Sequence, residues 1–476
     1  MFQNLPETTS FCRENGIKML DFMITDFKGR WRHLTIPAER LTARALESGF
    51  GFDGSNYGFA PVEKSDLAFV PDLSSAYIDH FAEIPTLTML GEVYVPDGPE
   101  KRRFEDDPRQ VAYKAQKYMK KLGVADEMRL SPELEFYVFD RVSYSINANG
   151  SMHQVDSCQG EWNSGAEGPN LGYKIAKNGG YHMAPPLDTL GGFRTRATLM
   201  MEKQGISVKY HHHEAGGPSQ LEIELEFGPM LEMADKTMMA RHLLKNAALA
   251  EGKTLTFMPK PIHGEPGNGL HVHLHLFKEG RPLFYDEGGY SQLSRAALYF
   301  IGGLLSHAAA LCAITNPSTN SYKRLVPGFA APVTIGYATA NRSGVIRIPA
   351  YARAPEEKRI EFRSPDASCN TYYAYAAILM AGLDGLEKKI DPEKEGYGPF
   401  DFNFYDLTAE EQKRLKTLPR SLSEALDALE RDHAFLTAGD VFTSALINKW
   451  IETKRTEEAE YNKYPQPMEF AMYYDF

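Results

Sequence analysis

Leu130-Ser-Pro-Glu-Leu-Glu-Phe-Tyr-Val-Phe139 alternates acidic and apolar residues from Glu133 onward. Folded as a β-strand, this segment places Glu133 and Glu135 on one face and Leu134 and Phe136 on the other. Two carboxylates about 7 Å apart on one face repel each other unless a cation or water lies near them. The segment therefore predicts either the solvated face of a sheet or one wall of a cation site.

Three other segments alternate in the same way and carry charged or imidazole groups on one face. They are Glu222, Glu224 and Glu226 in 220–227, His271, His273 and His275 in 269–276, and Arg359, Glu361 and Arg363 in 359–363. Each could be the wet side of an antiparallel sheet, but solvated strands usually mix Lys, Thr, Ser and Gln. A concave sheet that lines one metal- and anion-binding pocket explains all four segments together.

The types of side chain indicate which ligands this pocket would hold. Carboxylates with one or two imidazoles and no thiolate favour Mg²⁺ or Mn²⁺ over structural zinc. Arginines beside such a site favour a phosphate-bearing substrate, because guanidinium groups pair with phosphate oxygens in a bidentate way. The sequence contains no G-x-x-x-x-G-K-S/T loop, so we expect any nucleotide to be held by metals and arginines.

Composition limits the class of protein. The chain has 476 residues, 43% of them hydrophobic, and a formal net charge of −11. The negative charge argues against general binding to nucleic acid or anionic membranes, and we expect neither as a partner. The sequence contains no apolar run of about 20 residues, which is the length that a membrane-spanning helix requires. The four cysteines are widely spaced, which favours reduced thiols in a cytoplasmic protein.

Element patterns predict an α+β protein with two parts. Strands are expected at 17–25, 31–36, 67–71 and 86–95, and helices at 41–48, 109–122, 189–204, 230–251, 291–313 and 371–388. Residues 147–187 are predicted to be an ordered loop. The G-x-G-x-x-G match at 49–54 is not interpreted as a dinucleotide site, because a helix rather than a strand precedes it. The Pro-, Gly- and charge-rich run 96–108 is the expected domain boundary.

Taken together, these segments resemble type I glutamine synthetases, and the similarity extends over essentially the whole chain. The matching segments are Phe52-Asp-Gly-Ser55, the Glu133/Glu135 strand, Glu161-Trp-Asn163, Lys177-Asn-Gly-Gly-Tyr181, His211-His-His-Glu214, Phe257-Met-Pro-Lys-Pro261, Gly269-Leu-His271, Asn316-Pro-Ser-Thr-Asn-Ser-Tyr-Lys-Arg-Leu-Val-Pro-Gly328, Asn341-Arg-Ser343 and Pro467-Met-Glu-Phe-Ala-Met-Tyr-Tyr474. The resemblance implies a β-grasp domain over 1–105. It also implies a catalytic domain with a curved antiparallel sheet over 106–476, ending in a helical and apolar arm.

The resemblance also implies a role for individual residues. Two metal ions would be bound, one by Glu135, Glu214 and Glu222 and the other by Glu133, His271 and Glu361. The nucleotide would contact His273, Arg342, Arg347 and Arg359, while glutamate would contact Gly267, His271, Arg324 and Arg363. Asp53 would enter the site of a neighbouring subunit and hold ammonium, and Arg342 would act on the transferring phosphoryl group.

The implied activity is the ATP-dependent ligation of ammonia to the γ-carboxylate of glutamate, through γ-glutamyl phosphate. The products would be glutamine, ADP and phosphate, and the cofactor two Mg²⁺ or Mn²⁺ ions per site. The implied assembly is a dodecamer of two six-membered rings with active sites between subunits. Tyr405, in Asn403-Phe-Tyr-Asp-Leu407, resembles a tyrosine that some members adenylylate, but we favour the alternative of a tyrosine packed in a surface loop.

One departure from the family concerns the catalytic base. After the Arg-Leu-Val-Pro-Gly run, the family carries a glutamate that helps to deprotonate ammonium, whereas this chain has Ala330. Losing a positioned base typically costs about 10²–10⁴ in rate. The substitution is compatible with an engineered, silenced enzyme, with a ligase that uses a larger amine, or with a diverged, catalytically silent oligomer.

Overall fold

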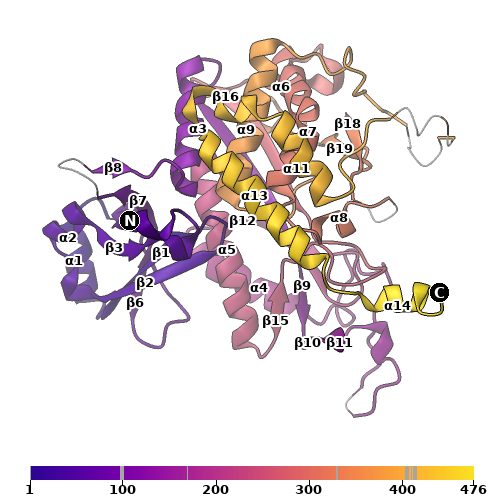
Figure 1. Ribbon diagram of the computed structural model, residues 1–476, viewed down its shortest axis with the longest axis horizontal. Helices are drawn as coiled ribbons and strands as arrows, with labels where there is room; N and C mark the ends of the chain where they lie inside the picture. The colour runs from indigo at the N-terminus through magenta and orange to yellow at the C-terminus, as the bar shows by residue number, and fades with distance from the viewer. Residues whose placement is uncertain are drawn as a thin grey trace.

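A small N-terminal unit packs beside a larger unit built around one extensive sheet (Figure 1). The computed structural model describes residues 2–96, 101–168, 170–327, 331–402, 407–408, 410 and 415–476. Apolar side chains from both units form one continuous buried core. The two units are therefore packed against each other rather than linked by a loose tether.

The N-terminal unit contains two four-stranded sheets and two short helices. The first sheet has the order β2-β1-β6-β5, and the second has the order β3-β4-β7-β8. The elements are α1 (Leu5–Glu14), β1 (Met19–Thr25), β2 (Trp31–Pro37), α2 (Ala43–Ser48), β3 (Phe50–Asp53), β4 (Asp66–Pro71), β5 (Tyr77–Ile78), β6 (Thr86–Met89), β7 (Gly91–Val95) and β8 (Arg102–Arg103).

The strand predicted over 86–95 is divided between these two sheets. β6 pairs with β1 in parallel, whereas β7 pairs with β4 in antiparallel. The chain crosses over at Gly91, where a Cβ atom would lie only 2.2 Å from the carbonyl oxygen of Val70. A glycine permits this close approach of two backbones, so one apolar run serves two sheets.

The larger unit is organised on a ten-stranded sheet with the main order β12-β13-β9-β16-β20-β19-β18. All of its pairs are antiparallel except β18 with β19. Its strands are β9 (Glu127–Phe139), β12 (Val208–His213), β13 (Gln220–Leu225), β14 (Gly228–Pro229), β15 (Thr254–Thr256), β16 (Leu270–Lys278), β17 (Arg281–Pro282), β18 (Thr334–Thr339), β19 (Gly344–Ile348) and β20 (Ile360–Phe362). Strand β9, which carries Glu133 and Glu135, lies near the middle of this sheet.

Helices cover the sheet and complete the core. They are α3 (Pro108–Leu122), α4 (Gly191–Lys203), α5 (Met230–Ala250), α6 (Arg295–Ser306), α7 (Ala308–Thr315), α8 (Ser321–Arg324), α9 (Thr371–Lys388), α11 (Leu422–Arg431), α12 (Ala434–Thr437), α13 (Ser444–Tyr461) and α14 (Pro467–Tyr473). Helix α9 contacts α3, α5, α6 and α7, and most of its side chains are buried. It is the central helix of the core.

The single helix predicted over 291–313 is two helices, α6 and α7, which meet at His307. Among the described residues, no single helix is long and apolar enough to cross a membrane. The α6–α7 pair together has the necessary length and composition but is bent by 71°. Most side chains of both helices are buried within the protein, which accounts for their apolar composition.

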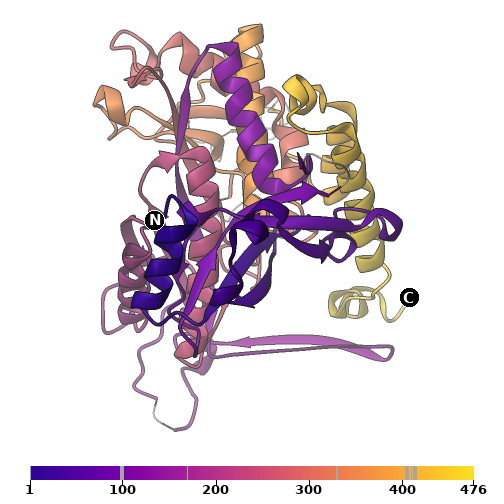
Figure 2. The same cartoon turned by 90° about the vertical axis from the view of Figure 1, so that its left-hand side faces the viewer.

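Two segments extend from the body of the molecule. Strands β10 (Arg141–Asn147) and β11 (Gly150–Asp156) form a hairpin that Figure 2 shows projecting as a long ribbon. Helix α14 lies at the end of the chain, beyond α13 (Figure 1). The sequence predicted a loop over 147–187, and β11 was missed because its residues, all exposed or half-buried, show no alternation of apolar and polar side chains.

Candidate active site

Strand β9 brings the predicted acidic residues together because it pairs with β13 on one side and β16 on the other. Glu133 lies opposite Glu224 on β13 and His271 on β16. Glu135 lies opposite Glu222. Directly opposed residues point to the same face of a sheet, so three strands concentrate their acidic and imidazole groups in one place.

The first group of potential metal ligands consists of Glu133, His271 and Glu361. One ligand atom from each lies within 4.8 Å of the others, and all three side chains are buried. The Nδ1 atom of His271 is 2.7 Å from Oε2 of Glu133 and 3.8 Å from Oε1 of Glu361. These are the three residues that the family resemblance assigns to one ion.

The second group consists of His212, Glu214 and Glu222, again within 4.8 Å of one another. The Nε2 atom of His212 is 3.2 Å from Oε1 of Glu222. Glu135 lies opposite Glu222, and its Oε2 accepts a hydrogen bond of 2.6 Å from the backbone N–H of Gly269. The family resemblance grouped Glu135 with Glu214 and Glu222, whereas the sequence left the role of His212 open.

Positive neighbours stabilise the charged form of two carboxylates. Although burial opposes ionisation, His273 and His271 hold the pKa of Glu133 well below its ordinary value. Burial likewise opposes ionisation of Glu361, but the nearby Arg363 guanidinium lowers its pKa to about 2. This part of the site is therefore charge-compensated by the protein itself.

The other two carboxylates lack such compensation. Burial, followed by repulsion from Glu135, raises the pKa of Glu214 to about 8. Burial and then repulsion from Glu133 raise the pKa of Glu222 well above its ordinary value. Buried acids that repel one another in this way fit a divalent cation, which would restore their ionised form.

Arginines lie beside the same acidic groups. Arg347 and Arg363 both form ion pairs with Glu361, and the Arg363 contact is 2.5 Å long. Arg324, on α8, donates to the backbone carbonyl of Ser364 at 2.7 Å, and its Nη2 lies 3.5 Å from Nε2 of His271. All three guanidinium groups are buried, so they bring fixed positive charge next to the carboxylates.

A further arginine, Arg359, and an imidazole, His273, lie next to strand β20. Arg359 stacks over the rings of Phe227 and Tyr351, with separations of 5.6 and 5.4 Å. His273 is fully buried, and its Nε2 lies 2.8 Å from Oε1 of Glu133. Its Nδ1 has no hydrogen-bond partner among the described residues. Arg342 is exposed in the turn before β19.

Two other predicted residues occupy loops. Asp53 ends β3 in the N-terminal unit, is exposed, and accepts hydrogen bonds from Ser55 and Asn56. Gly267 lies in the loop before β16, where a Cβ atom would be only 2.7 Å from Cγ of Arg324. The fold thus brings Gly267 next to Arg324, whereas Asp53 hydrogen-bonds residues that follow it closely in the sequence. Ala330 and Tyr405 fall outside the described residues.

The tertiary structure adds polar residues that sequence reasoning left without a role. Glu224 is fully buried and accepts hydrogen bonds from Ser131 at 3.0 Å and Lys209 at 2.8 Å. Its carboxylate lies 3.8 Å from Nε2 of His273, and it forms a third group of potential ligands with Glu133 and His273. The alternation of 220–227 was the signal that pointed to it.

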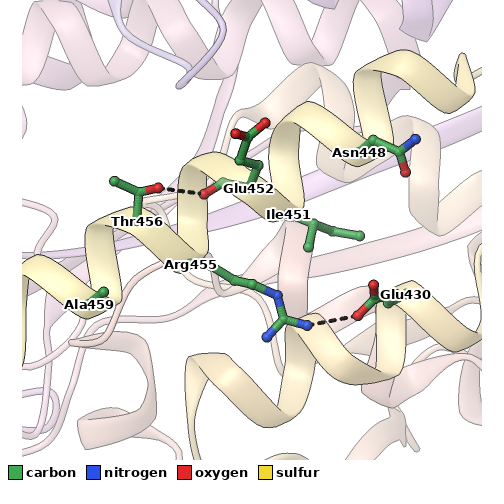
Figure 3. A pocket seen from close by; sticks show the side chains of 7 residues that line it. All are labelled: Glu430, Asn448, Ile451, Glu452, Arg455, Thr456 and Ala459. Atoms are coloured by element: carbon green, nitrogen blue, oxygen red, sulfur yellow. Dashed lines mark hydrogen bonds and ion pairs between the residues drawn. The ribbon is translucent and has the colours of Figure 1, made fainter.

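A separate hollow of about 580 Å³ lies on the surface between α11 and α13 (Figure 3). Its lining residues are Glu430, Asn448, Ile451, Glu452, Arg455, Thr456 and Ala459. Arg455 crosses the hollow to form an ion pair of 2.8 Å with Glu430. None of its lining residues belongs to the group of acidic side chains around β9, so this hollow is separate from the candidate active site.

A sheet that carries buried acids and imidazoles on one face, with buried arginines beside them, is the arrangement of a metal-dependent enzyme for phosphorylated substrates. Comparisons with known proteins specify which one. The model for "Glutamine synthetase, beta-Grasp domain" matches residues 16–96, and that for "Glutamine synthetase, catalytic domain" matches residues 105–473. The chain belongs to the glutamine synthetase family.

Individual relatives match over the full length. The glutamine synthetase of Frankia alni is 44% identical over 479 residues, and that of Streptomyces filamentosus is 45% identical over 477 residues; both alignments cover 100% of each chain. A cryo-EM structure of Plasmodium falciparum glutamine synthetase has a TM-score of 0.88 at 30% identity and covers 99% of each chain. The predicted family, fold class and enzymatic nature are therefore confirmed, and the family uses ATP and divalent metal ions.

Proposed function

We propose that this chain ligates ammonia to the γ-carboxylate of glutamate at the expense of ATP, giving glutamine, ADP and phosphate. The observation that carries this proposal is the convergence of acidic, imidazole and guanidinium groups on one face of the sheet, centred on Glu133 and His271. Membership of the glutamine synthetase family supports the same activity.

The chemistry explains why such a set of groups is needed. A carboxylate resists attack by ammonia because its oxygen is a very poor leaving group. Transfer of the γ-phosphoryl group of ATP to glutamate forms γ-glutamyl phosphate, from which phosphate can leave when ammonia attacks the carbonyl carbon. Negative charge gathers on the transferring group, so positive groups fixed in a buried site lower the barrier.

We propose Mg²⁺ or Mn²⁺ as the cofactor, with two ions per site. The ligands would be Glu133, His271 and Glu361 for one ion, and Glu135, Glu214 and Glu222 for the other. When bound, the ions supply positive charge that neutralises the transferring phosphoryl group. The raised pKa values of Glu214 and Glu222 support a cation at that position, because these buried carboxyls have too little positive charge of their own.

The nucleotide would be held by His273, Arg342, Arg347 and Arg359. The unpartnered Nδ1 of His273 and the stacked, buried guanidinium of Arg359 support this assignment. On the phosphoryl group itself, Arg342 would stabilise the developing charge, and its exposed side chain is free of ion pairs with described residues.

Glutamate would be held by Gly267, His271, Arg324 and Arg363. Arg324 supports this role because backbone carbonyls fix its buried guanidinium beside His271. Asp53 would hold ammonium in the site of a neighbouring subunit. Its exposure supports contact with another chain, and its hydrogen bonds to Ser55 lower its pKa, which keeps it negative.

We propose a two-domain division at residues 105 and 106, an assembly of two six-membered rings, and a cytoplasmic location. The exposed apolar side chains of α14 support assembly, since Phe470 is 58% and Tyr474 is 81% exposed. The exposed hairpin β10–β11 offers Tyr144, which is 77% exposed. Four free cysteines support a reducing compartment.

The decisive assay measures phosphate release by the purified chain with ATP and Mg²⁺ or Mn²⁺. Release should require glutamate and ammonium together, and Ala330→Glu should raise the ammonium-dependent rate by about 10²–10⁴ because it restores a base. Release without glutamate would contradict the proposal. Metal-dependent ATP binding with no turnover, even in Ala330→Glu, would instead indicate a catalytically silent oligomer.

A second candidate activity is the ligation of a larger amine to glutamate. The observation that favours it is Ala330, whose small side chain stands where the family has a glutamate. A panel of alkylamines and polyamines should then support faster phosphate release than ammonium does, and Ala330→Glu should reverse that order. Rates equal to or below the ammonium rate would exclude this activity.

A further inference from the structure

The loop before β16 is attached to the sheet by a buried tyrosine. Tyr137 lies on β9 two residues after Glu135, on the same face, and is fully buried. Its hydroxyl donates a hydrogen bond of 2.8 Å to the backbone carbonyl oxygen of Pro266. The contact joins the strand that carries Glu133 and Glu135 to the residue next to Gly267.

The following residues of the loop are held from the same two strands. Gln220, opposite Tyr137 on β13, donates from Nε2 to the carbonyl oxygen of Gly267 at 3.0 Å and to Oδ1 of Asn268 at 3.1 Å. The N–H of Gly269 donates to Glu135 at 2.6 Å. The loop thus enters β16 with each successive residue fixed by a side chain of β9 or β13.

Close packing leaves little room for this loop to move. At Gly267, a Cβ atom would lie 2.4 Å from the carbonyl oxygen of Pro259 and 2.7 Å from Cγ of Arg324. At Gly216, a Cβ atom would lie 2.2 Å from the hydroxyl oxygen of Tyr137. A shift at Pro266 must therefore displace its neighbour Gly267 and the arginine packed on it.

We propose that Tyr137 is a positioning residue for glutamate, acting through the carbonyl of Pro266 on Gly267 and Arg324. This inference rests on the proposed function, which assigns Gly267 and Arg324 to the amino-acid substrate. Tyr137 would set the affinity for glutamate, because the atoms it orders contact the substrate before and during the reaction alike. It would leave the nucleotide unaffected, since the nucleotide is assigned to Arg347 and Arg359.

Steady-state kinetics of Tyr137→Phe in the full chain test the proposal. The substitution leaves the buried carbonyl of Pro266 without its donor, a loss that corresponds to roughly a 10-fold rise in KM for glutamate. KM for ATP and kcat at saturating glutamate should stay within about twofold, since an interaction equal in ground and transition states changes KM alone. Equal rises in both KM values, a fall in kcat alone, or an unchanged KM for glutamate would overturn the proposal.

The matched control is Tyr375→Phe. The Tyr375 hydroxyl is also buried, lies 3.1 Å from Oγ1 of Thr237 between α9 and α5, and touches no residue of the loop. It should lower thermal stability without changing KM for glutamate. If Tyr137→Phe does not fold, Gln220→Leu, which removes the contact to Gly267, should raise KM for glutamate in the same way, and no rise would overturn the proposal.

Calorimetric titration with glutamate separates this inference from the proposed function. A wild-type chain that binds no glutamate, with or without ATP and Mg²⁺, would overturn both. A wild-type chain that binds or turns over glutamate, with Tyr137→Phe matching its Kd and KM, would overturn only the positioning role of Tyr137. Weaker binding by Tyr137→Phe supports the role, whether or not ammonium is the amine.

Discussion

Replacing Glu222 with glutamine tests the electrostatics of the buried cluster of acidic side chains around β9. The side chain is only 5% exposed and faces His212 at 3.2 Å. Removing one unit charge about 4 Å from a cation charge costs about 4 kcal/mol per unit of cation charge at an effective dielectric of 20. Part of this is returned, because the protein no longer has to ionise Glu222 against its acidic neighbours. For a divalent ion the full cost would be about 8 kcal/mol, so even after this return we expect affinity for one Mn²⁺ ion to fall at least roughly 100-fold, which corresponds to about 2.7 kcal/mol.

The metal-free protein should respond in the opposite direction. The pKa of Glu222 is raised, so the folded chain without metal favours the protonated carboxyl, which glutamine resembles. Metal-free Glu222→Gln should therefore be at least as thermally stable as the metal-free wild type. Addition of Mn²⁺ should then stabilise the variant less than the wild type, because at a given concentration a ligand that binds the folded chain more weakly stabilises it less.

Calorimetric titration of chelator-treated protein with Mn²⁺ measures the affinity, and thermal unfolding with and without Mn²⁺ measures the stability. Glu232→Gln is the matched control, since Glu232 is 52% exposed and pairs with Lys236 on the surface of α5. Unchanged Mn²⁺ affinity in Glu222→Gln, or an equal loss in Glu232→Gln, would refute the electrostatic reasoning.

Three further outcomes are expected. His307 hydrogen-bonds both Asp384 at 3.0 Å and Asp432 at 2.7 Å. Burial opposes protonation of the imidazole, but these hydrogen bonds raise the pKa of His307 above its ordinary value. The stability that protonated His307 contributes is therefore complete below the unfolded-state pKa and is lost as pH rises through the folded-state pKa. The difference in Tm between wild type and His307→Gln should accordingly shrink with increasing pH, and a growing difference would contradict this. Arg109→Met should lower the free energy of unfolding by about 3 kcal/mol in chemical or thermal unfolding, because it leaves Asp235 on α5 and Asp72 in the N-terminal unit without their ion-pair partner. Arg295→Met, at an exposed arginine, should change the free energy of unfolding little. Deletion of α14 and the residues after it should reduce the proposed assembly to smaller species in light scattering, and an unchanged mass would contradict a role of this segment in assembly.

Much of the site was readable from the sequence because strand alternation has a period of two. Glu133 and Glu135 share a face in any β-strand, and the same holds for His271 with His273. Residue chemistry then indicated a hard cation and a phosphate. The matching segments along the chain specified the family, which the full-length relatives confirm.

The sequence by itself therefore determined the fold class and the family, and it predicted the acidic, imidazole and arginine groups of the candidate site. Only the tertiary structure decided which of these groups are neighbours, because strand register depends on pairing between segments far apart in the chain. That pairing puts His212 beside Glu222 and attaches Tyr137 to Pro266. It also divides the run 86–95 between two sheets and bends the apolar run 291–313 at His307. Local patterns carry no record of such contacts, which arise when distant segments compete for the same buried space.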